Sequence, residues 1–288
     1  MPELPEVETV RRGLAPVMVG ARIAAVECRR PDLRFPLPDG FAARLTGADV
    51  VRLDRRGKYL LVELSTDETV IMHLGMSGRF SIAAAASATR PGEFYHAKDV
   101  DPKHNHVVLR TEGPDGAAEI IYNDPRRFGF MDIAPSDGLD ACKHFHAMGP
   151  EPLSNGFSAE DFSARLKGKK TPIKQALLDQ RVVAGVGNIY ACEALFMAGV
   201  SPRRTAASVA GARAVRLHRA VIEVLRAAID AGGSSLKDFA AADGALGYFQ
   251  HRFQVYDRAD EECVKCGAPV RRIVQSGRST FFCGVCQR

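Results

Sequence analysis

The chain has 288 residues, of which 46% are hydrophobic and 25% are charged, and its mean hydropathy is −0.11. This composition is typical of a globular protein with about two domains, and it excludes a mainly disordered chain, a collagen-like repeat and a coiled coil. No run approaches the roughly 18 apolar residues of a membrane span. Because Glu3, Glu6 and Glu8 precede Arg11, the N-terminus is neither a secretory signal nor a transit peptide, and we expect a cytoplasmic protein.

Basic residues outnumber acidic ones by 39 to 34, so the formal net charge is +5. The excess is uneven, since residues 160–220 carry 11 Lys and Arg against 4 Asp and Glu. This balance mildly favours a polyanionic partner.

The first elements predicted along the chain are a helix and a block of strands. Apolar residues recur at helical spacing through residue 17, Pro5 suits the first helical position, and Gly20 ends the pattern. Residues 48–65, 68–82 and 104–123 then alternate like β-hairpins. Several strands with no helical pattern between them predict a sandwich or barrel. The low-complexity run at 82–92 is predicted to be a surface insertion.

Turn-forming residues near 134–157 predict a linker, after which the apolar period becomes helical. Ser158 begins one predicted helix, and Thr171 begins another with Pro172 at its first position. A longer amphipathic helix is predicted over 208–229, ending at two glycines. The last thirty residues return to short strands.

Four of the seven cysteines are paired at the C-terminus. Cys263 and Cys266 are separated by two residues, as are Cys283 and Cys286, and sixteen residues lie between the pairs. This spacing predicts one structural zinc ion in a closed site, with a redox pair or an iron–sulfur cluster as weaker alternatives. The arginines between the pairs, among them Arg278, either contact phosphates or form a solvated basic tip.

The N-terminal sequence Met-Pro-Glu-Leu-Pro-Glu suggests a nucleophile. If Met1 is removed, Pro2 carries a free amine beside Glu3 and Glu6. At pH 7.5 about a third of an ordinary α-amine is neutral, against roughly 0.1% of lysine. Attack of this amine on a sugar C1′ would yield an iminium, and Glu3 could transfer protons. The alternative is that Pro2 merely starts a helix and the glutamates favour its dipole.

Many motifs, in order and over nearly the whole chain, resemble bacterial formamidopyrimidine-DNA glycosylases, which remove oxidised purines such as 8-oxoguanine from DNA. They are MPELPEVETVRRGL, RRGKYLL, HLGMSG, KHNHVVL, NDPRRFGF, GPEPL, KKTPIKQALLD, GVGNIYACEALF, LKDF, GYFQ, QVYDR and GRSTFFC. The chain departs from the family in a longer segment around 81–104, a surface loop.

The resemblance implies an α+β fold with four parts. These are an N-terminal helix plus β-sandwich catalytic domain at 1–134, a linker at 135–157, a helix–two-turns–helix DNA-binding domain at 158–257 and a four-cysteine zinc-finger β-hairpin at 258–288. The implied cofactor is one structural Zn²⁺. The implied partner is double-stranded DNA with an oxidised base or an abasic site, bound by a monomer associated with the nucleoid and not with a membrane.

The resemblance also implies roles for individual residues. Pro2 would be the Schiff-base nucleophile, Glu3 the proton donor and acceptor with help from Glu6, and Lys58 a proton donor for strand cleavage. Arg278 would grip a phosphate beside the lesion. The implied DNA contacts are His73 and Asn188 to the backbone, Met76, Arg126 and Phe128 inserted into the duplex, Lys174 near the damaged base, and residues 234–248 as a loop over that base.

The implied reaction is base removal followed by β- and δ-elimination, so the protein would be both a glycosylase and a lyase in base excision repair. Two alternatives remain open. One is an endonuclease VIII-like enzyme for oxidised pyrimidines, which Leu4 and the Met76, Arg126 and Phe128 set disfavour. The other is a zinc-ribbon DNA-binding protein without catalysis, which leaves the N-terminal motif unexplained.

Overall fold

The computed structural model describes residues 1–84, 101–234 and 248–288. The chain divides into two compact units, one of Met1–His146 with Gly232–Tyr248 and the other of Ala147–Ala231 with Phe249–Arg288. Most of the predicted insertion around 81–104 and of the predicted loop at 234–248 lies outside the described residues. Among the described residues, no helix combines the length and apolarity that a bilayer crossing needs.

Helix α1, Leu4–Met18, begins where two glutamates meet. The backbone N–H of Glu3 donates to Glu6 Oε2 at 2.9 Å, which satisfies one of the donors that a helix start leaves unpaired. The helix buries Val7, Val10 and Leu14 in the core of the first unit, and Gly20 follows it with a φ of 76°. The predicted N-terminal helix is therefore confirmed.

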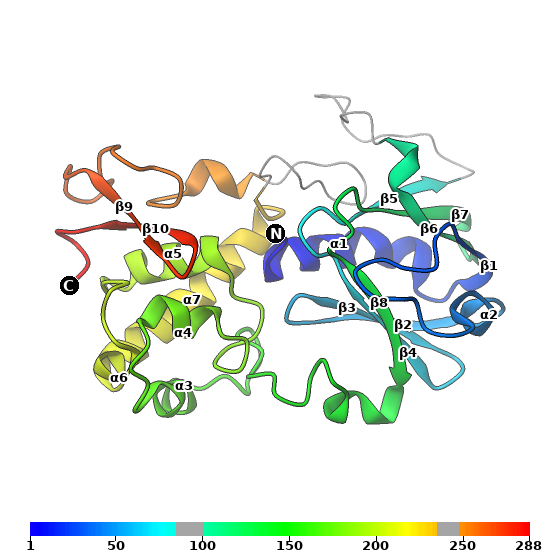
Figure 1. The fold of residues 1–288 in the computed structure, drawn as a ribbon, viewed down its shortest axis with the longest axis horizontal. Helices are drawn as coiled ribbons and strands as arrows, with labels where there is room; N and C mark the ends of the chain where they lie inside the picture. The colour runs from blue at the N-terminus through cyan, green and yellow to red at the C-terminus, as the bar shows by residue number, and fades with distance from the viewer. Residues whose placement is uncertain (85–100, 235–247) are drawn as a thin grey trace. The chain divides into compact units, whose positions relative to one another are not determined.

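Two four-stranded antiparallel sheets complete the first unit (Figure 1). In spatial order the strands of one sheet are β1 Arg22–Cys28, β6 Asn105–Gly113, β7 Gly116–Asn123 and β5 Arg79–Ala84. Those of the other are β2 Val50–Arg56, β3 Tyr59–Leu64, β4 Glu68–His73 and β8 Phe130–Pro135. Short helical turns are α2 Phe41–Leu45, η1 Pro102–His104 and η2 Ser136–Ala141. Helix α1 and both sheets contribute to one apolar core, which confirms the predicted sandwich.

Two of the three predicted hairpins are present. Arg56 pairs with Tyr59 across a two-residue turn, and β6 pairs with β7. The third, over residues 68–82, is wrong, because β4 pairs with β3 and β8 whereas β5 pairs with β7 in the other sheet. The alternation of apolar and polar residues indicates that each strand buries one face, but it does not identify the neighbouring strand. Residues 74–78 therefore connect the two sheets.

Helices dominate the second unit. They are α3 Ala159–Leu166, α4 Ile173–Leu178, α5 Asn188–Met197, α6 Ala206–Val209, α7 Ala212–Asp230 and the turn η3 Phe249–Arg252. Ser158 caps α3 as predicted, since its Oγ accepts from the N–H of Asp161. The single helix predicted over 208–229 is instead two helices, because Gly211 adopts a φ of 87° that breaks the helical run.

The C-terminal hairpin joins β9 Val270–Gln275 and β10 Arg278–Cys283. Cys192 and Phe196 of α5 pack with Val270, Phe281 and Cys283 of the hairpin in one buried cluster. The hairpin is therefore fixed to the most buried helix of the second unit. The stretch predicted as a linker divides between the units, with residues 135–146 in the first and 147–157 in the second.

Candidate functional site

The N-terminal residues singled out by sequence are all buried. Pro2 is buried, and Glu3 and Glu6 expose 3% and 2% of their surface. One carboxylate oxygen of Glu6 accepts from the N–H of Glu3 at 2.9 Å. The other accepts from the N–H and the Oγ of Ser234 at 2.8 and 2.9 Å. Glu6 thus holds the backbone beside Pro2 and Glu3. While Met1 is attached, the nitrogen of Pro2 is a peptide nitrogen.

Lys58 lies in the two-residue turn between β2 and β3. It is 7% exposed, and Gly57 before it has a φ of 56°, a value that glycine adopts without strain. Its positive charge lies close enough to His73, at the end of β4, to disfavour protonation of that imidazole. The hairpin therefore presents Lys58 next to His73.

His73 is a neutral imidazole in a ring cluster. Burial, with the neighbouring charges of Lys58 and Arg34, lowers its pKa from 6.5 to about 4. Its Nδ1 accepts from the backbone N–H of Gly75 at 3.0 Å, so the proton of the neutral ring lies on Nε2. The ring stacks on Phe130, with centroids 5.4 Å apart and planes 11° apart. His73 can therefore donate a hydrogen bond from Nε2 without carrying a charge.

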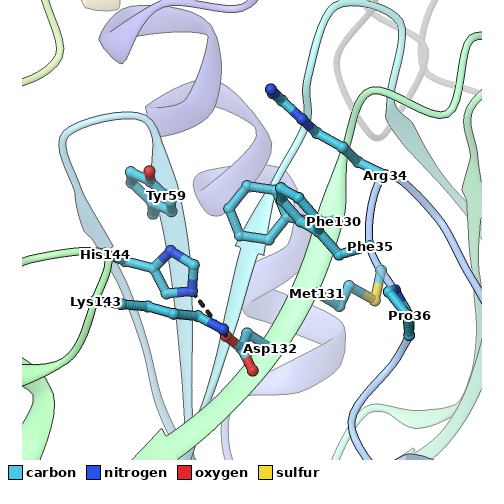
Figure 2. A pocket seen from close by; sticks show the side chains of 9 residues that line it. All are labelled: Arg34, Phe35, Pro36, Tyr59, Phe130, Met131, Asp132, Lys143 and His144. Carbon is cyan, nitrogen blue, oxygen red and sulfur yellow. Dashed lines mark hydrogen bonds and ion pairs between the residues drawn. The ribbon is translucent and has the colours of Figure 1, made fainter.

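A cavity of about 470 Å³ in the first unit borders this cluster (Figure 2). Phe130 stacks on His144 as well as on His73, and His144 Nε2 lies 2.8 Å from Asp132 Oδ2. Lys143 Nζ lies 2.8 Å from the same oxygen. The cavity is lined by Arg34, Phe35, Pro36, Tyr59, Phe130, Met131, Asp132, Lys143 and His144. Its charged groups are thus mostly paired with one another.

The three residues predicted to enter DNA lie on two loops of the first unit. Met76 and Phe128 expose 38% and 42% of their surface, although both are apolar, and Arg126 is also exposed. The guanidinium carbon of Arg126 lies 4.8 Å from the centre of the Phe128 ring. Two buried polar residues of the same loops, Ser77 and Asp124, are not among those singled out by sequence, although both lie in quoted motifs.

In the second unit, Lys174 and Asn188 both contact the strand that begins with Arg278. Lys174 is fully buried, and its Nζ donates to the carbonyl oxygen of Ser279 at 2.9 Å and to Thr280 Oγ1 at 2.6 Å. Asn188, the first residue of α5, donates from Nδ2 to the same carbonyl at 3.0 Å. Arg278 itself is exposed. Lys174 is therefore inaccessible to solvent in this conformation, and its ammonium group binds the hairpin.

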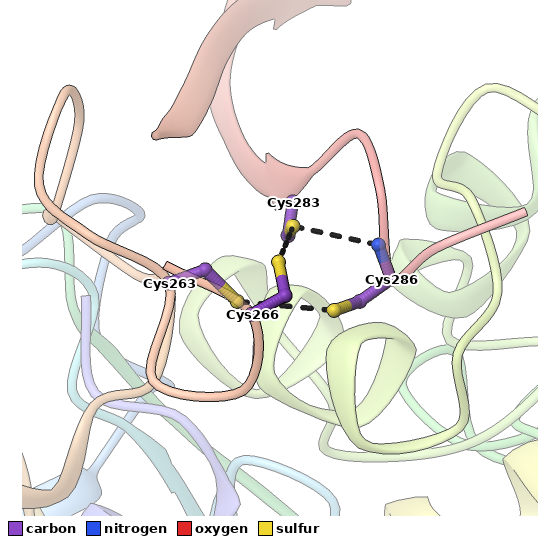
Figure 3. Close-up of side chains that lie close together, drawn as sticks. All are labelled: Cys263, Cys266, Cys283 and Cys286. Carbon is purple, nitrogen blue, oxygen red and sulfur yellow. Dashed lines mark hydrogen bonds between the residues drawn. The ribbon is translucent and has the colours of Figure 1, made fainter. Parts of the chain in front are cut away.

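The four paired cysteines converge as a metal site requires (Figure 3). Their sulfur atoms all lie within 4.8 Å of one another, with 3.9 Å between Cys263 and Cys286 and 3.5 Å between Cys266 and Cys283. A tetrahedral zinc ion with bonds of about 2.3 Å requires sulfurs about 3.8 Å apart. The four thiolates therefore fit one Zn²⁺ ion and leave it no open position, so the site is structural.

Comparison with known proteins places this geometry in a family. Residues 1–131 match the formamidopyrimidine-DNA glycosylase N-terminal domain, residues 148–240 match its H2TH domain, and residues 260–288 match the zinc finger found in formamidopyrimidine-DNA glycosylase and isoleucyl-tRNA synthetase. A Caulobacter sp. (strain K31) protein named formamidopyrimidine-DNA glycosylase is 59% identical over 289 residues, which is 100% of each chain.

Solved structures of the Lactococcus lactis protein match over the whole length. Its complex with DNA containing an abasic site has a TM-score of 0.84 at 35% identity and covers 99% of each chain. A mutant bound to DNA containing Fapy-dG has a TM-score of 0.85 at 34% identity and covers 100% of each chain. The wild-type protein has also been solved with DNA containing an oxidised pyrimidine, at a TM-score of 0.84, 35% identity and 100% coverage of each chain. The chain belongs to the formamidopyrimidine-DNA glycosylase family.

Proposed function

We propose that this protein excises oxidised purines from double-stranded DNA and then cleaves the strand at the abasic site. The observation that carries the proposal is the N-terminal arrangement, in which Pro2 and Glu3 are buried beside a fixed Glu6 carboxylate. Support comes from the relatives, since the Lactococcus lactis protein was solved with Fapy-dG and abasic DNA. We further propose that it acts in the cytoplasm, at the nucleoid, as a monomer.

In the proposed reaction, removal of Met1 turns the nitrogen of Pro2 into a secondary amine. This amine attacks C1′ of the damaged nucleotide, the bond from C1′ to the base breaks, and the base leaves with a proton. The amine then loses its own proton, and opening of the sugar ring at O4′ gives a cationic iminium. The iminium withdraws electrons and acidifies the C2′ proton. Loss of that proton expels the 3′ phosphate, and a second elimination expels the 5′ phosphate.

Glu3 and Lys58 serve these proton transfers in the proposal. Glu3 protonates O4′ as the ring opens and later accepts a proton, because a carboxyl group adjacent to the amine can act in both directions. Lys58 donates a proton to a departing phosphate. Arg278 holds a phosphate beside the lesion through its guanidinium group.

The remaining residues position the DNA. We propose that His73 and Asn188 bind the backbone, and that Met76, Arg126 and Phe128 fill the space left by the extruded base and contact its unpaired partner. Lys174 supports Arg278 through its bonds to Ser279 and Thr280, and a direct contact with the damaged base would require those bonds to break.

We also propose a division of labour along the chain. Residues 1–134 would carry the chemistry and the inserted side chains, and residues 158–257 and 258–288 would hold the phosphates, with 135–157 as the connection. The zinc ion would keep the hairpin folded so that Arg278 is presented at a fixed position.

Borohydride trapping tests the nucleophile. Protein that lacks Met1, as checked by mass spectrometry of the N-terminus, should form a covalent adduct with duplex DNA containing 8-oxoguanine, because borohydride reduces the iminium to a stable amine. A chain that keeps one residue in front of Pro2 should bind the same DNA without an adduct. Equal trapping of both chains would refute the role of Pro2, and binding without trapping by either would support a non-catalytic zinc-ribbon protein.

The substrate preference is tested with the same protein. Excision of 8-oxoguanine should be faster than excision of thymine glycol in otherwise identical duplexes. A marked preference for thymine glycol would instead support the endonuclease VIII-like alternative, for which the oxidised-pyrimidine complex of the Lactococcus lactis protein is a specific reason to test.

A further inference from the structure

The two loops that carry the exposed Met76 and Phe128 touch through their backbones. We call residues 74–78 the Met76 loop and residues 124–129 the Phe128 loop. A Cβ atom added to Gly75, whose φ is 63°, would lie 2.3 Å from the backbone of Phe128 and Gly129. A Cβ added to Gly129 would lie 2.7 Å from the carbonyl oxygen of His73. Neither position tolerates a side chain, so the two loops form one contact surface.

A buried carboxylate lies beneath this contact. Asp124 is fully buried, and its Oδ1 accepts from Ser77 Oγ of the Met76 loop at 2.5 Å. Its Oδ2 accepts from the N–H of Gly129 at 2.9 Å and from the Tyr122 hydroxyl of β7 at 3.2 Å. Ser77 Oγ in turn accepts from the N–H of Arg126 at 3.2 Å. One side chain therefore joins both loops to the sheet.

The hydrogen-bond partners of Asp124 indicate that its carboxylate has a structural role. In the part of the chain that the structure describes, Asp124 forms no salt bridge with lysine or arginine, so hydrogen-bond donors alone offset the cost of burying it. Its two oxygens accept several bonds at once, which lets one side chain join several donors. The donors come from three separate segments, so their relative positions depend on Asp124.

The exposed side chains are only partly held by packing, since the contact between Arg126 and the Phe128 ring lies at the surface. Met76 and Phe128 are apolar yet 38% and 42% exposed, and Arg126 is exposed as well, so packing alone does not fix their positions. Side chains that enter DNA must be held within a fraction of an ångström of a productive position. Along the chain, Ser77 is the neighbour of Met76, and Asp124 precedes Arg126 by two residues and Phe128 by four. The hydrogen bonds of Asp124 and Ser77 therefore act close to all three side chains.

We propose that Asp124, acting with Ser77, is a positioning residue that holds Met76, Arg126 and Phe128 in the arrangement that enters the duplex. The proposal rests on the proposed function, since it assigns these side chains to the space left by an extruded base. Asp124 is buried beneath the loops and touches neither the DNA nor the reacting atoms. Its contribution concerns base extrusion and not the chemistry at Pro2.

Two substrates distinguish an effect on base extrusion from an effect on the chemistry at Pro2. Duplex DNA with 8-oxoguanine requires extrusion of a stacked base, whereas single-stranded DNA with an abasic site has neither a base to extrude nor a partner base to contact. Asp124→Ala and Ser77→Ala should each lower kcat/KM on the duplex by at least about tenfold, as expected for loss of a bond to a buried charged group. Cleavage of the single strand should change by less than about twofold, because the groups around Pro2 are intact.

A conservative variant and a matched control complete the experiment. Asp124→Asn should restore most of the duplex activity, because its amide oxygen can still accept from Gly129 while Ser77 Oγ accepts from its amide nitrogen. Thr69→Val removes another buried hydroxyl of the first unit, one bonded to Ser136 Oγ at 2.8 Å, and should affect neither substrate.

The outcomes are distinct. Equal losses on both substrates, or an unchanged duplex rate in Ser77→Ala and Asp124→Ala, would overturn the positioning role. A wild-type protein that cleaves neither substrate and forms no borohydride adduct would instead refute the proposed function.

Discussion

At the scale of single residues, His73 shows how the fold selects one protonation state. Its ring is buried against Phe130, its Nδ1 accepts from Gly75, and the charges of Lys58 and Arg34 oppose a further positive charge. The pKa of His73 is therefore lowered to about 4. A neutral donor contributes direction to a phosphate contact and adds little to the salt dependence of binding.

The lowered pKa of His73 predicts a loss of stability in acid. The unfolded imidazole binds a proton near pH 6.5, whereas the folded one binds it near pH 4, so the unfolded state takes up more protons as the pH falls through this window. Between pH 7 and pH 5 the free energy of unfolding of the wild type should fall by about 2 kcal/mol more than that of His73→Gln. Urea unfolding at both pH values measures this, and parallel losses in the two proteins would contradict it.

At the scale of secondary-structure elements, the zinc hairpin is joined to two helices by polar contacts. Lys174 of α4 and Asn188 of α5 donate to the same carbonyl oxygen, that of Ser279, which directly follows Arg278. Thr280 Oγ1 accepts from Lys174 and donates to Gln275 of the opposite strand. Because these contacts adjoin Arg278, the helices determine where the hairpin presents it.

A double-mutant cycle tests whether Lys174 acts through Arg278. Lys174→Met removes the donor and keeps most of the buried stem, so it should weaken binding to duplex DNA with an abasic site by about tenfold. In an Arg278→Ala background the same change should weaken binding by less than about twofold, since the group that it positions is absent. Thermal unfolding serves as the control for folding. A full loss in the Arg278→Ala background would show that Lys174 acts independently of Arg278.

At the scale of the whole molecule, the first unit and the C-terminal hairpin depend on different sources of stability. The first unit has a large apolar core shared by α1 and two sheets, whereas the C-terminal hairpin adds only a small cluster against α5. Segments of this size gain much of their folding energy from metal binding, about 10–16 kcal/mol in comparable peptides. Zinc therefore stabilises the hairpin selectively.

Removal of zinc should unfold one region and spare the other. Elemental analysis should find one zinc ion per chain, and a chelator at neutral pH should abolish amide protection in β9 and β10 while protection in β2, β3 and β4 persists. DNA binding should fall at the same time, because Arg278 lies in β10. Cys28→Ser, which changes a cysteine outside the cluster, should keep its zinc. Loss of protection throughout the first unit would contradict this division.

The sequence by itself determined whatever depends on neighbours along the chain. The cysteine spacing predicted the zinc ligands, the alternation around Gly57 and Gly113 predicted two hairpins, and Ser158 marked the start of α3, because each signal acts over a few residues. The order of the motifs along nearly the whole chain predicted the family, because it is read from the sequence without knowledge of tertiary contacts.

Only the tertiary structure decided which distant groups meet. The pairing of β4 with β8 and of β5 with β7, the burial of Lys174 against the hairpin, and the bond from Ser77 to Asp124 join residues that are 34 to 106 positions apart. The alternation of apolar and polar residues, together with residue type, indicates whether a side chain is buried or polar. The partner follows from how the sheets and helices pack, since burial and hydrogen bonding are satisfied by the fold as a whole.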